Sequence, residues 1–250
     1  MNSSQLFGHL ESASYSDTGR RRMKNEDSLL CMNEQGVFIV ADGMGGAGGG
    51  DVASRITVDA LRDAYKGPNE IGLTEKVALF RTASDEASRR IKERADRDRV
   101  RGMGSTVVGV VFDHLDHRRA AILHAGDSRV YLSRNGELSK LMVDHSPAAE
   151  AGIDDESLVP FFMQGIITRA VGVRTSVKLE LTYIDLEASD KLLICSDGLY
   201  NMLSDEEIVD VMSGAESLGD ATRSLVAAAN DAGGLDNITV VLVDVGEPKS

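Results

Sequence analysis

The distribution of apolar and polar residues predicts short, buried strands near both ends of the chain. Val37–Ala41 (VFIVA), Lys191–Cys195 (KLLIC) and Asn237–Val243 (NITVVLV) are nearly continuous apolar runs, which are typical of strands covered on both faces. Two less regular segments, His9–Tyr15 and Ser28–Met32, also predict strands. The chain therefore begins with hairpin-like strands rather than with a strand–helix unit.

The middle of the chain is also rich in predicted strands. Closely spaced apolar runs lie at Ser105–Phe112, Arg119–His124, Arg129–Ser133, Leu138–Val143 and Lys178–Tyr183. The dipeptide Asn135-Gly136 predicts a two-residue hairpin turn between two of these runs. Ser146–Gly165 lacks a regular pattern, so we expect an irregular connection with one helical turn.

Other segments have the spacing of amphipathic helices. These segments are Gly50–Tyr65, Thr74–Arg97, Ser204–Met212 and Ser217–Asp231. In the second of them, the predicted buried stripe consists of Leu79, Ala83, Ala87 and Ile91. In the third, Ser204 and Glu207 have the spacing of a capping box, which predicts where the helix begins.

Hairpins dominate this pattern, and helices come in pairs, so a regular parallel sheet is not expected. We predict an α+β fold, a sandwich of antiparallel sheets packed face to face with helices outside. No internal repeat, low-complexity tract or proline-rich linker divides the chain. Residues 1–250 are therefore expected to form a single domain.

Composition narrows the possible functions. The 40 acidic and 27 basic residues give a net charge of −13, which opposes binding of nucleic acid through a broad basic surface. The longest uncharged apolar stretch, about Gly102–Phe112, is too short to cross a bilayer, and no secretory signal is expected at the start. Cys31 and Cys195 lie among apolar neighbours, so we expect buried thiols in a cytoplasmic protein. The charge and the short apolar stretch predict neither nucleic-acid nor membrane partners.

A glycine-rich segment follows the predicted strand Val37–Ala41. Gly43, Gly45 and Gly48 match the G-x-G-x-x-G pattern of dinucleotide sites. However, Asp42 stands where a pyrophosphate would approach, and no first βαβ unit surrounds the match. Three interpretations remain open: a dinucleotide site, a tight turn between strand and helix, and a loop whose backbone approaches a metal ion.

Several aspartates share one context, the end of a buried strand beside glycine or a small polar residue. They are Asp27, Asp42, Asp127, Asp197 and Asp236. Strand ends lie close together in a sandwich, so these carboxylates are expected to converge. Carboxylates that converge need a compensating charge, and ligand sets made only of oxygen favour Mg²⁺ or Mn²⁺. Capping or a hairpin tip remains the alternative for any single one.

The order of short motifs resembles the metal-dependent Ser/Thr protein phosphatases (the PPM or type-2C family) in their bacterial form. The motifs are SDTGRRRMKNED (16–27), VADGMGG (40–46), GMGST (102–106), HAGDSRVYL (124–132), VDHS (143–146), ITRAVG (167–172), CSDGLYN (195–201) and DNITV (236–240). Each motif alone is short, but eight in the family's order are specific. The resemblance extends from about Ser14 to Val245.

The resemblance implies a four-layer α-β-β-α sandwich with two ions of Mn²⁺ or Mg²⁺ at one end. Asp42 matches the aspartate that bridges both ions, Gly43 matches a carbonyl ligand, and Asp197 and Asp236 match ligands of the second ion. Glu26 and Asp27 match acids that hold metal-bound waters, and Arg22 matches the arginine that binds the substrate phosphate. Asp127 matches a residue that, with the position of Asp197, binds a third, weaker ion in some members.

These roles imply hydrolysis of phosphoserine and phosphothreonine by direct attack of a water that bridges the two ions, because such a water loses a proton near neutral pH. Neither cysteine has the C-x5-R pattern of phosphatases that form a phosphoenzyme. The expected partners are phosphorylated proteins, including Ser/Thr kinases and their substrates, and we expect a monomer.

Several positions depart from the family pattern. Ala47 stands where bacterial members often carry a histidine, and the connection Asp144–Gly165 is shorter than the usual flap. Met44 replaces the histidine that eukaryotic relatives place after the D-G pair, and Asn201 replaces an acid that some relatives have, which weakens the third-ion prediction. Two alternatives to an active phosphatase remain. One is a pseudophosphatase that signals by binding, which the intact Arg22, Asp42, Asp197 and Asp236 disfavour. The other is the nucleotide-binding oxidoreductase that the glycine pattern would indicate.

Overall fold

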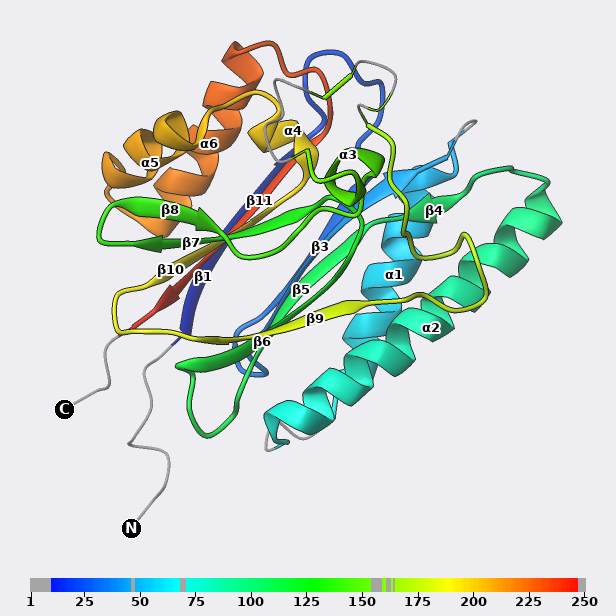
Figure 1. Ribbon diagram of the computed structural model, residues 1–250, viewed down its shortest axis with the longest axis horizontal. Helices are drawn as coiled ribbons and strands as arrows, with labels where there is room; N and C mark the ends of the chain where they lie inside the picture. Colours follow the sequence, from blue (N-terminus) through cyan, green and yellow to red (C-terminus); the bar gives the residue numbers. More distant parts are fainter. Residues whose placement is uncertain are drawn as a thin grey trace.

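The protein is a sandwich of two antiparallel sheets with helices on both outer faces (Figure 1). The computed structural model describes residues 10–45, 48–67, 71–153, 159–160, 163 and 165–246. The first sheet has the strand order β1-β11-β10-β7-β8, and the second has the order β2-β3-β5-β6-β9, with β4 paired to β3. The predicted α+β class and the antiparallel sheets are confirmed.

The first sheet combines the two ends of the described chain with its middle. Its strands are β1 (Leu10–Asp17), β11 (Ile238–Val245), β10 (Lys191–Cys195), β7 (Arg129–Arg134) and β8 (Glu137–Lys140). Asn135 and Gly136 both have positive φ, 54° and 81°, as a two-residue hairpin turn requires. The predicted hairpin between β7 and β8 is therefore confirmed.

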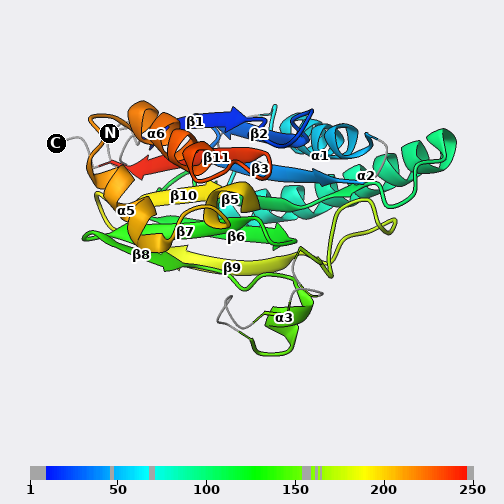
Figure 2. The ribbon, with the colours of Figure 1, turned by 90° about the horizontal axis from the view of Figure 1, so that it is seen from above.

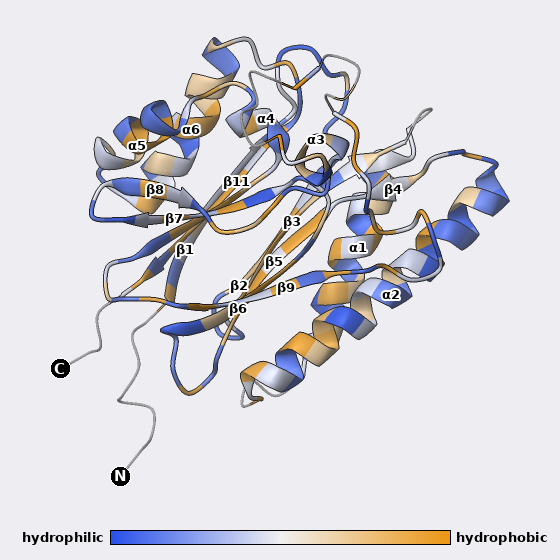
Figure 3. Cartoon of the chain, viewed as in Figure 1, coloured by the Kyte–Doolittle hydropathy of each residue, from blue (hydrophilic) through white to orange (hydrophobic). Residues whose placement is uncertain are grey.

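The second sheet consists of β2 (Asp27–Met32), β3 (Val37–Met44), β5 (Val107–Phe112), β6 (Arg119–Ala125) and β9 (Glu180–Asp185), together with the short β4 (Gly104–Ser105). Side chains of β3 alternate between two cores because successive residues of a strand point to opposite faces. Phe38 and Val40 face the other sheet, whereas Val37, Ile39 and Ala41 face the helices. Figure 3 shows these central strands as the hydrophobic interior of the molecule.

Helices cover the outer face of each sheet. The helices α1 (Gly50–Ala64) and α2 (Leu73–Asp98) pack on the second sheet, and α5 (Asp205–Ser213) and α6 (Leu218–Asp231) pack on the first. The short α4 (Asp197–Tyr200) follows β10, and α3 (Pro147–Glu150) projects from the sandwich beside β9 (Figure 2). Three apolar cores therefore separate four layers, as the resemblance implied. None of the described helices has the length and apolarity needed to span a membrane.

The predicted stripe of α2 was partly wrong. Ala83, Ala87 and Ile91 are buried, but Leu79 is only half-buried, and Phe80 is fully buried instead. Lys76 on the same face is also buried, and its Nζ donates hydrogen bonds to the carbonyls of Gln35 and Phe112. A lysine that is satisfied by two buried carbonyls does not show in a pattern of apolar residues. Ser204 and Glu207 form the predicted capping box of α5.

Gly109 allows α2 to approach β5 closely. A Cβ at this position would overlap the ring of Phe80 and would lie 3.3 Å from Ile39 Cγ1. We expect Gly109→Ala to lower the free energy of unfolding by about 1–3 kcal/mol, because the surrounding core is already filled. Chemical denaturation monitored by circular dichroism measures this change.

Gly67→Ala is the matched control, since apart from its chain neighbours no described residue comes within 4 Å of a Cβ there. The packing argument requires this control variant to keep the stability of the wild type. Equal stability of the two variants would contradict it.

Candidate metal centre

Carboxylates from separate segments of the chain meet at one end of the sandwich. Asp42, Asp127, Asp197 and Asp236 line one cavity of about 360 Å³, together with Glu26, Gly43 and Arg22. Asp27 lies directly beside Asp42, because the two residues are paired across β2 and β3. The structure thus brings together all eight residues that the sequence singled out.

Backbone pairing fixes Asp42 near the end of β3. Its N–H donates to Thr106 Oγ1 at 2.9 Å, and its carbonyl accepts from the N–H of Thr106 at 2.8 Å. We expected the strand to end before Asp42, but β4 pairs with Gly43 and Met44 and extends it. Asp42 is therefore held by a sheet on both sides rather than by a loop.

Gly43 lies against two other backbone segments. A Cβ at this position would overlap the carbonyl of Gly50 and the carbonyl oxygen of Glu26. The Gly43 N–H donates to the Glu26 carbonyl at 3.1 Å. A glycine is therefore required here by the close packing of three backbone segments within the strand, not by a turn at this residue.

Asp197 begins α4 directly after β10. Its neighbour Ser196 donates from Oγ to Asp27 Oδ2 at 2.8 Å, which connects the two sheets at the site. The Asn201 amide donates to Asp197 Oδ2 at 3.2 Å. Asp127 lies in the turn after β6, where its carbonyl accepts from the Tyr200 hydroxyl at 2.9 Å. Tyr200 on α4 thus holds the backbone of Asp127, and Asn201 at the end of α4 holds the carboxylate of Asp197.

Asp236 faces Arg22 across the mouth of the cavity. Arg22 Nη2 lies 2.6 Å from Asp236 Oδ2, and about half of the Arg22 side chain is exposed. The hydrogen bond to Asp236 raises the pKa of the Arg22 guanidinium above its usual value. Arg22 is therefore a charged group at the mouth of an otherwise acidic cavity, in reach of an incoming anion.

Asn237 was not identified from the sequence, although it holds the segment that carries Arg22. Its buried side chain accepts from the Glu26 N–H at 2.8 Å and donates to the carbonyls of Thr18 and Lys24 at 2.8 and 2.9 Å. Asn237 lines the cavity, and these three hydrogen bonds fix the backbone of the distant segment that carries Arg22. Its place inside the motif DNITV was the only available sign.

Burial and mutual repulsion raise the pKa values of the clustered carboxyls. Burial is the main cause at Asp42, where neighbouring carboxylates add to it and hold the pKa well above the usual value. Burial also raises the pKa of Asp27 to about 6, that of Asp127 to about 6 and that of Asp197 to about 8. Each shift means that the folded protein disfavours the negative charge unless a cation compensates it.

The residues present fit divalent cations. The buried Oδ1 atoms of Asp27 and Asp197 accept no hydrogen bond from the part of the chain that the structure describes. Buried polar atoms of this kind are rare because each one costs free energy. A set of carboxylate and carbonyl oxygens without nitrogen or sulfur suits Mg²⁺ or Mn²⁺.

A second group of possible ligands lies under the turn that carries Asp127. His124 and His145 stack with ring centroids 4.4 Å apart, and His145 lies 3.1 Å from Glu180. His145 Nδ1 accepts from the Gly126 N–H, and Arg169 Nη1 is 2.9 Å from His145 Nε2. With a guanidinium already beside the ring, we assign this group to positioning the turn rather than to binding metal.

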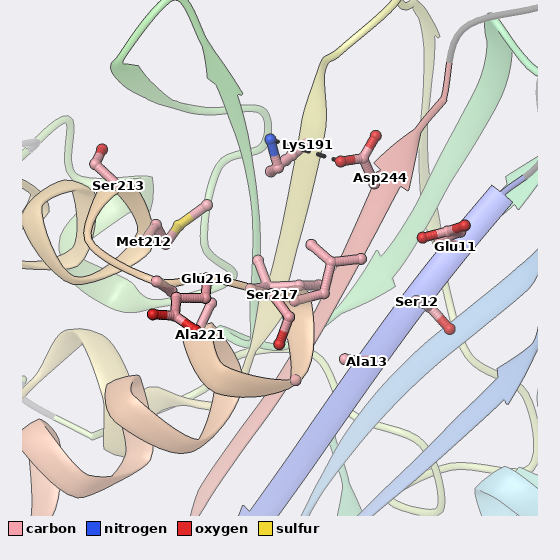
Figure 4. A pocket seen from close by; sticks show the side chains of 14 residues that line it. Glu11, Ser12, Ala13, Lys191, Met212, Ser213, Glu216, Ser217, Ala221 and Asp244 are labelled. Carbon is pink, nitrogen blue, oxygen red and sulfur yellow. Dashed lines mark ion pairs between the residues drawn. The ribbon is translucent and has the colours of Figure 1, made fainter.

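A larger cavity, about 670 Å³, lies at the other end of the first sheet (Figure 4). It lies between the start of β1, the end of β11 and the N-terminus of α6, and the Lys191–Asp244 ion pair at 3.5 Å spans two strands beside it. None of the eight predicted site residues lines it. The size of a cavity therefore does not identify the site here; the chemistry of its lining does.

Comparison with known proteins agrees with this site. The family model of protein phosphatase 2C matches residues 18–233. The chain belongs to the protein phosphatase 2C family. The resemblance seen in the motifs is thereby confirmed, and the glycine pattern after β3 no longer indicates a dinucleotide-binding enzyme.

Relatives within the protein phosphatase 2C family are similar over most of their length. The serine/threonine phosphatase stp of Listeria welshimeri is 35% identical over 237 residues, which are 91% of this chain and 93% of the relative. Protein phosphatase PhpP of Streptococcus pneumoniae is 35% identical over 246 residues, 95% of this chain and 98% of the relative.

A solved structure of the family also contains metal. The catalytic domain of the serine/threonine protein phosphatase PstP, in complex with two manganese ions, has a TM-score of 0.82 and 32% identity, covering 95% of this chain and 99% of that one. This likeness confirms the four-layer fold class for the present chain.

Proposed function

We propose that this chain is a protein phosphatase dependent on Mn²⁺ or Mg²⁺ that hydrolyses phosphoserine and phosphothreonine in proteins. The observation that carries the proposal is the convergence of Asp42, Asp127, Asp197 and Asp236 in one cavity. Buried carboxylate oxygens of Asp27 and Asp197 accept no hydrogen bond from the described residues, which supports it. The names of the family and of its relatives support the same activity.

The proposal assigns a role to each residue around the cavity. Asp42 and the Gly43 carbonyl would hold two ions together with Asp197 and Asp236, and Glu26 and Asp27 would support water molecules beside them. Asp127 contributes with Asp197 to a third, weaker ion. Because the Asn201 amide already donates to Asp197, we expect that ion to bind more weakly than the other two.

The chemistry follows from these roles. Two bound divalent ions lower the pKa of water and neutralise phosphate charge, which supplies a nucleophile at neutral pH. Arg22 binds a phosphate oxygen and leaves Asp236 as it does so. Because its guanidinium donors are fixed in a plane, Arg22 also orients the phosphorus toward the cavity floor. The described lining contains no cysteine or serine, which agrees with the proposed direct attack by water.

We further propose the setting in which the enzyme acts. Residues 1–250 form a single phosphatase domain, present as a cytoplasmic monomer whose partners are Ser/Thr kinases and their phosphorylated substrates. The free thiols of Cys31 and Cys195 support a reducing compartment, although Cys31 is only half-buried rather than buried as expected. Arg20 and Arg21 are exposed on the segment of Arg22 and would favour acidic substrates.

Hydrolysis of p-nitrophenyl phosphate and of a phosphothreonine peptide with Mn²⁺ tests the proposal. Turnover that requires the metal and stops with EDTA is the expected result. A protein that binds phosphopeptides but shows no metal-stimulated turnover would instead be the binding-only pseudophosphatase.

Replacement of Arg22 tests the assignment of the phosphate-binding group. We expect Arg22→Ala to lower kcat/KM about 10- to 100-fold, since charge-assisted hydrogen bonds contribute about 1.5–3 kcal/mol. Arg22→Lys restores the charge but not the paired donors, and is expected to recover only part of the loss. Steady-state kinetics on the phosphothreonine peptide measures both, and unchanged kinetics in Arg22→Ala would exclude the assignment.

A further inference from the structure

A second cavity, about 420 Å³, opens directly beside the metal centre. It shares Asp127, Gly165, Asp197 and Asp236 with the acidic cavity, so the two form one continuous depression. A substrate that places its phosphate at Arg22 and Asp42 must therefore lie across or beside this second cavity. None of the roles assigned so far uses it.

Apolar side chains line this cavity together with the carboxylates. Ile166 and Leu235 are among its lining residues and are 46% and 56% exposed. Met202 and the buried Ala148 also line it, from the segment after α4 and from α3. Large exposed apolar residues from distant segments are seldom gathered at one hollow without a binding role.

In the described part of the chain, four carboxylates and one guanidinium line this cavity: Asp144 pairs with Arg129, and Asp127, Asp197 and Asp236 belong to the metal centre. Arg129 lines it as the single cation among the described lining residues, and its Nη2 lies 2.6 Å from Asp144 Oδ2. The Arg129 guanidinium also lies 3.4 Å above the centre of the Tyr200 ring. An acidic side chain would meet carboxylates and a guanidinium that Asp144 already binds. A lysine would find only the carboxylate that pairs with Arg129 and those proposed to bind ions, and it would lose hydration against Leu235 and Met202.

We propose that this cavity, here called the apolar subsite, binds an aliphatic or aromatic side chain that flanks the phosphorylated residue of a protein substrate. The proposal rests on the phosphatase function proposed above and narrows its substrate class. An extended chain spans about 3.3–3.6 Å per residue, so the bound side chain lies within about three positions of the phosphoresidue. Ile166 and Leu235 form the mouth of the subsite and determine specificity.

A matched series of phosphothreonine peptides tests the subsite. The peptides differ only in carrying Leu, Ser, Glu or Lys at one of the three positions on either side of the phosphothreonine. At one position, we expect kcat/KM of the wild type with Mn²⁺ to be about 10-fold or more higher for Leu than for Ser, Glu or Lys, because a hydrophobic pocket discriminates at this scale.

Variants identify the residues responsible. Ile166→Ser and the double variant Ile166→Ser/Leu235→Ser are expected to lose most of this preference while hydrolysing p-nitrophenyl phosphate within about 2-fold of the wild type. Leu115→Ser is the matched control, because Leu115 is 60% exposed and lines neither cavity. Leu235 is next to Asp236, so the double variant could lose turnover for another reason. In that case the peptide preference of Ile166→Ser alone tests the subsite.

The outcomes separate the two proposals. Equal kcat/KM for all peptides in an active wild-type enzyme, or a preference for Leu that survives in both variants, overturns the apolar subsite and leaves the phosphatase function intact. A preference for Glu or Lys overturns the subsite as well. A wild type without turnover of p-nitrophenyl phosphate overturns the phosphatase proposal itself.

Discussion

Asp42→Asn is expected to lower Mn²⁺-dependent turnover by about 10³-fold or more, because Asp42 is proposed to bind both ions that activate water and bind phosphate. The substitution keeps the shape of the side chain. Its backbone bonds to Thr106 also remain. Burial and neighbouring carboxylates already raise the pKa of Asp42, so a neutral asparagine is expected to leave the metal-free protein equally stable or more stable.

This combination of effects distinguishes a site residue from a structural one. A manganese titration of activity and a thermal melt in EDTA measure the two properties on the same variants. Asp113→Asn serves as the control, because Asp113 accepts a local bond from the Leu115 N–H and does not line the cavity. Near-normal turnover in Asp42→Asn, or a loss of activity explained by unfolding, would rule out the assigned role.

Mn²⁺ is expected to raise the melting temperature strongly, and more at pH 8 than at pH 5. An ion at 100 times its Kd stabilises the folded state by about 2.7 kcal/mol, which corresponds to about 5–10 °C for a chain of this size. At pH 5 the carboxyls of Asp27, Asp127 and Asp197, with pKa values of about 6, 6 and 8, hold protons that the ion must displace.

The pH dependence of the metal-free protein has the opposite sign. Carboxyls whose pKa is higher in the folded than in the unfolded state bind more protons when folded. Their contribution to stability is present below the unfolded value, about 3.9, and is lost as pH rises through the folded values of about 6 to 8. Melting in EDTA from pH 5 to pH 8 should therefore show a falling midpoint, and Mn²⁺ should reverse this trend.

Asp96→Asn provides the comparison for this experiment, since Asp96 is an exposed acid on α2. It is expected to respond to pH and Mn²⁺ like the wild type, whereas Asp42→Asn responds less to both. A melting temperature that does not change with Mn²⁺ at pH 8 would contradict a metal site in this cavity.

The sequence predicted the site better than it predicted the edges of the elements. The eight site residues lie in motifs whose order is specific, so their convergence could be expected before any coordinates. Asp42 was nevertheless expected after a strand and lies inside β3. The reason is the pairing of Gly43 and Met44 with β4, a contact with a distant segment that local patterns do not contain.

Buried polar side chains were the other limit of prediction. Lys76 takes part in the core of α2 because two carbonyls satisfy its ammonium group, and Asn237 orders a loop through three hydrogen bonds. Neither role follows from the residue type alone, since both depend on backbone groups brought close by the fold. The apolar subsite was missed for the same reason, because Ile166 and Leu235 become neighbours of one cavity only in three dimensions.

The carboxylates of the metal centre belong to different sheets. Asp27 and Asp42 come from the second sheet, whereas Asp197 and Asp236 adjoin β10 and β11 of the first. Any sliding of one sheet over the other would change the spacing of the ligands, so catalysis depends on the relative alignment of the two halves of the sandwich. Thermal inactivation should consequently coincide with loss of the interface between the sheets, and activity can serve as a sensitive reporter of that alignment.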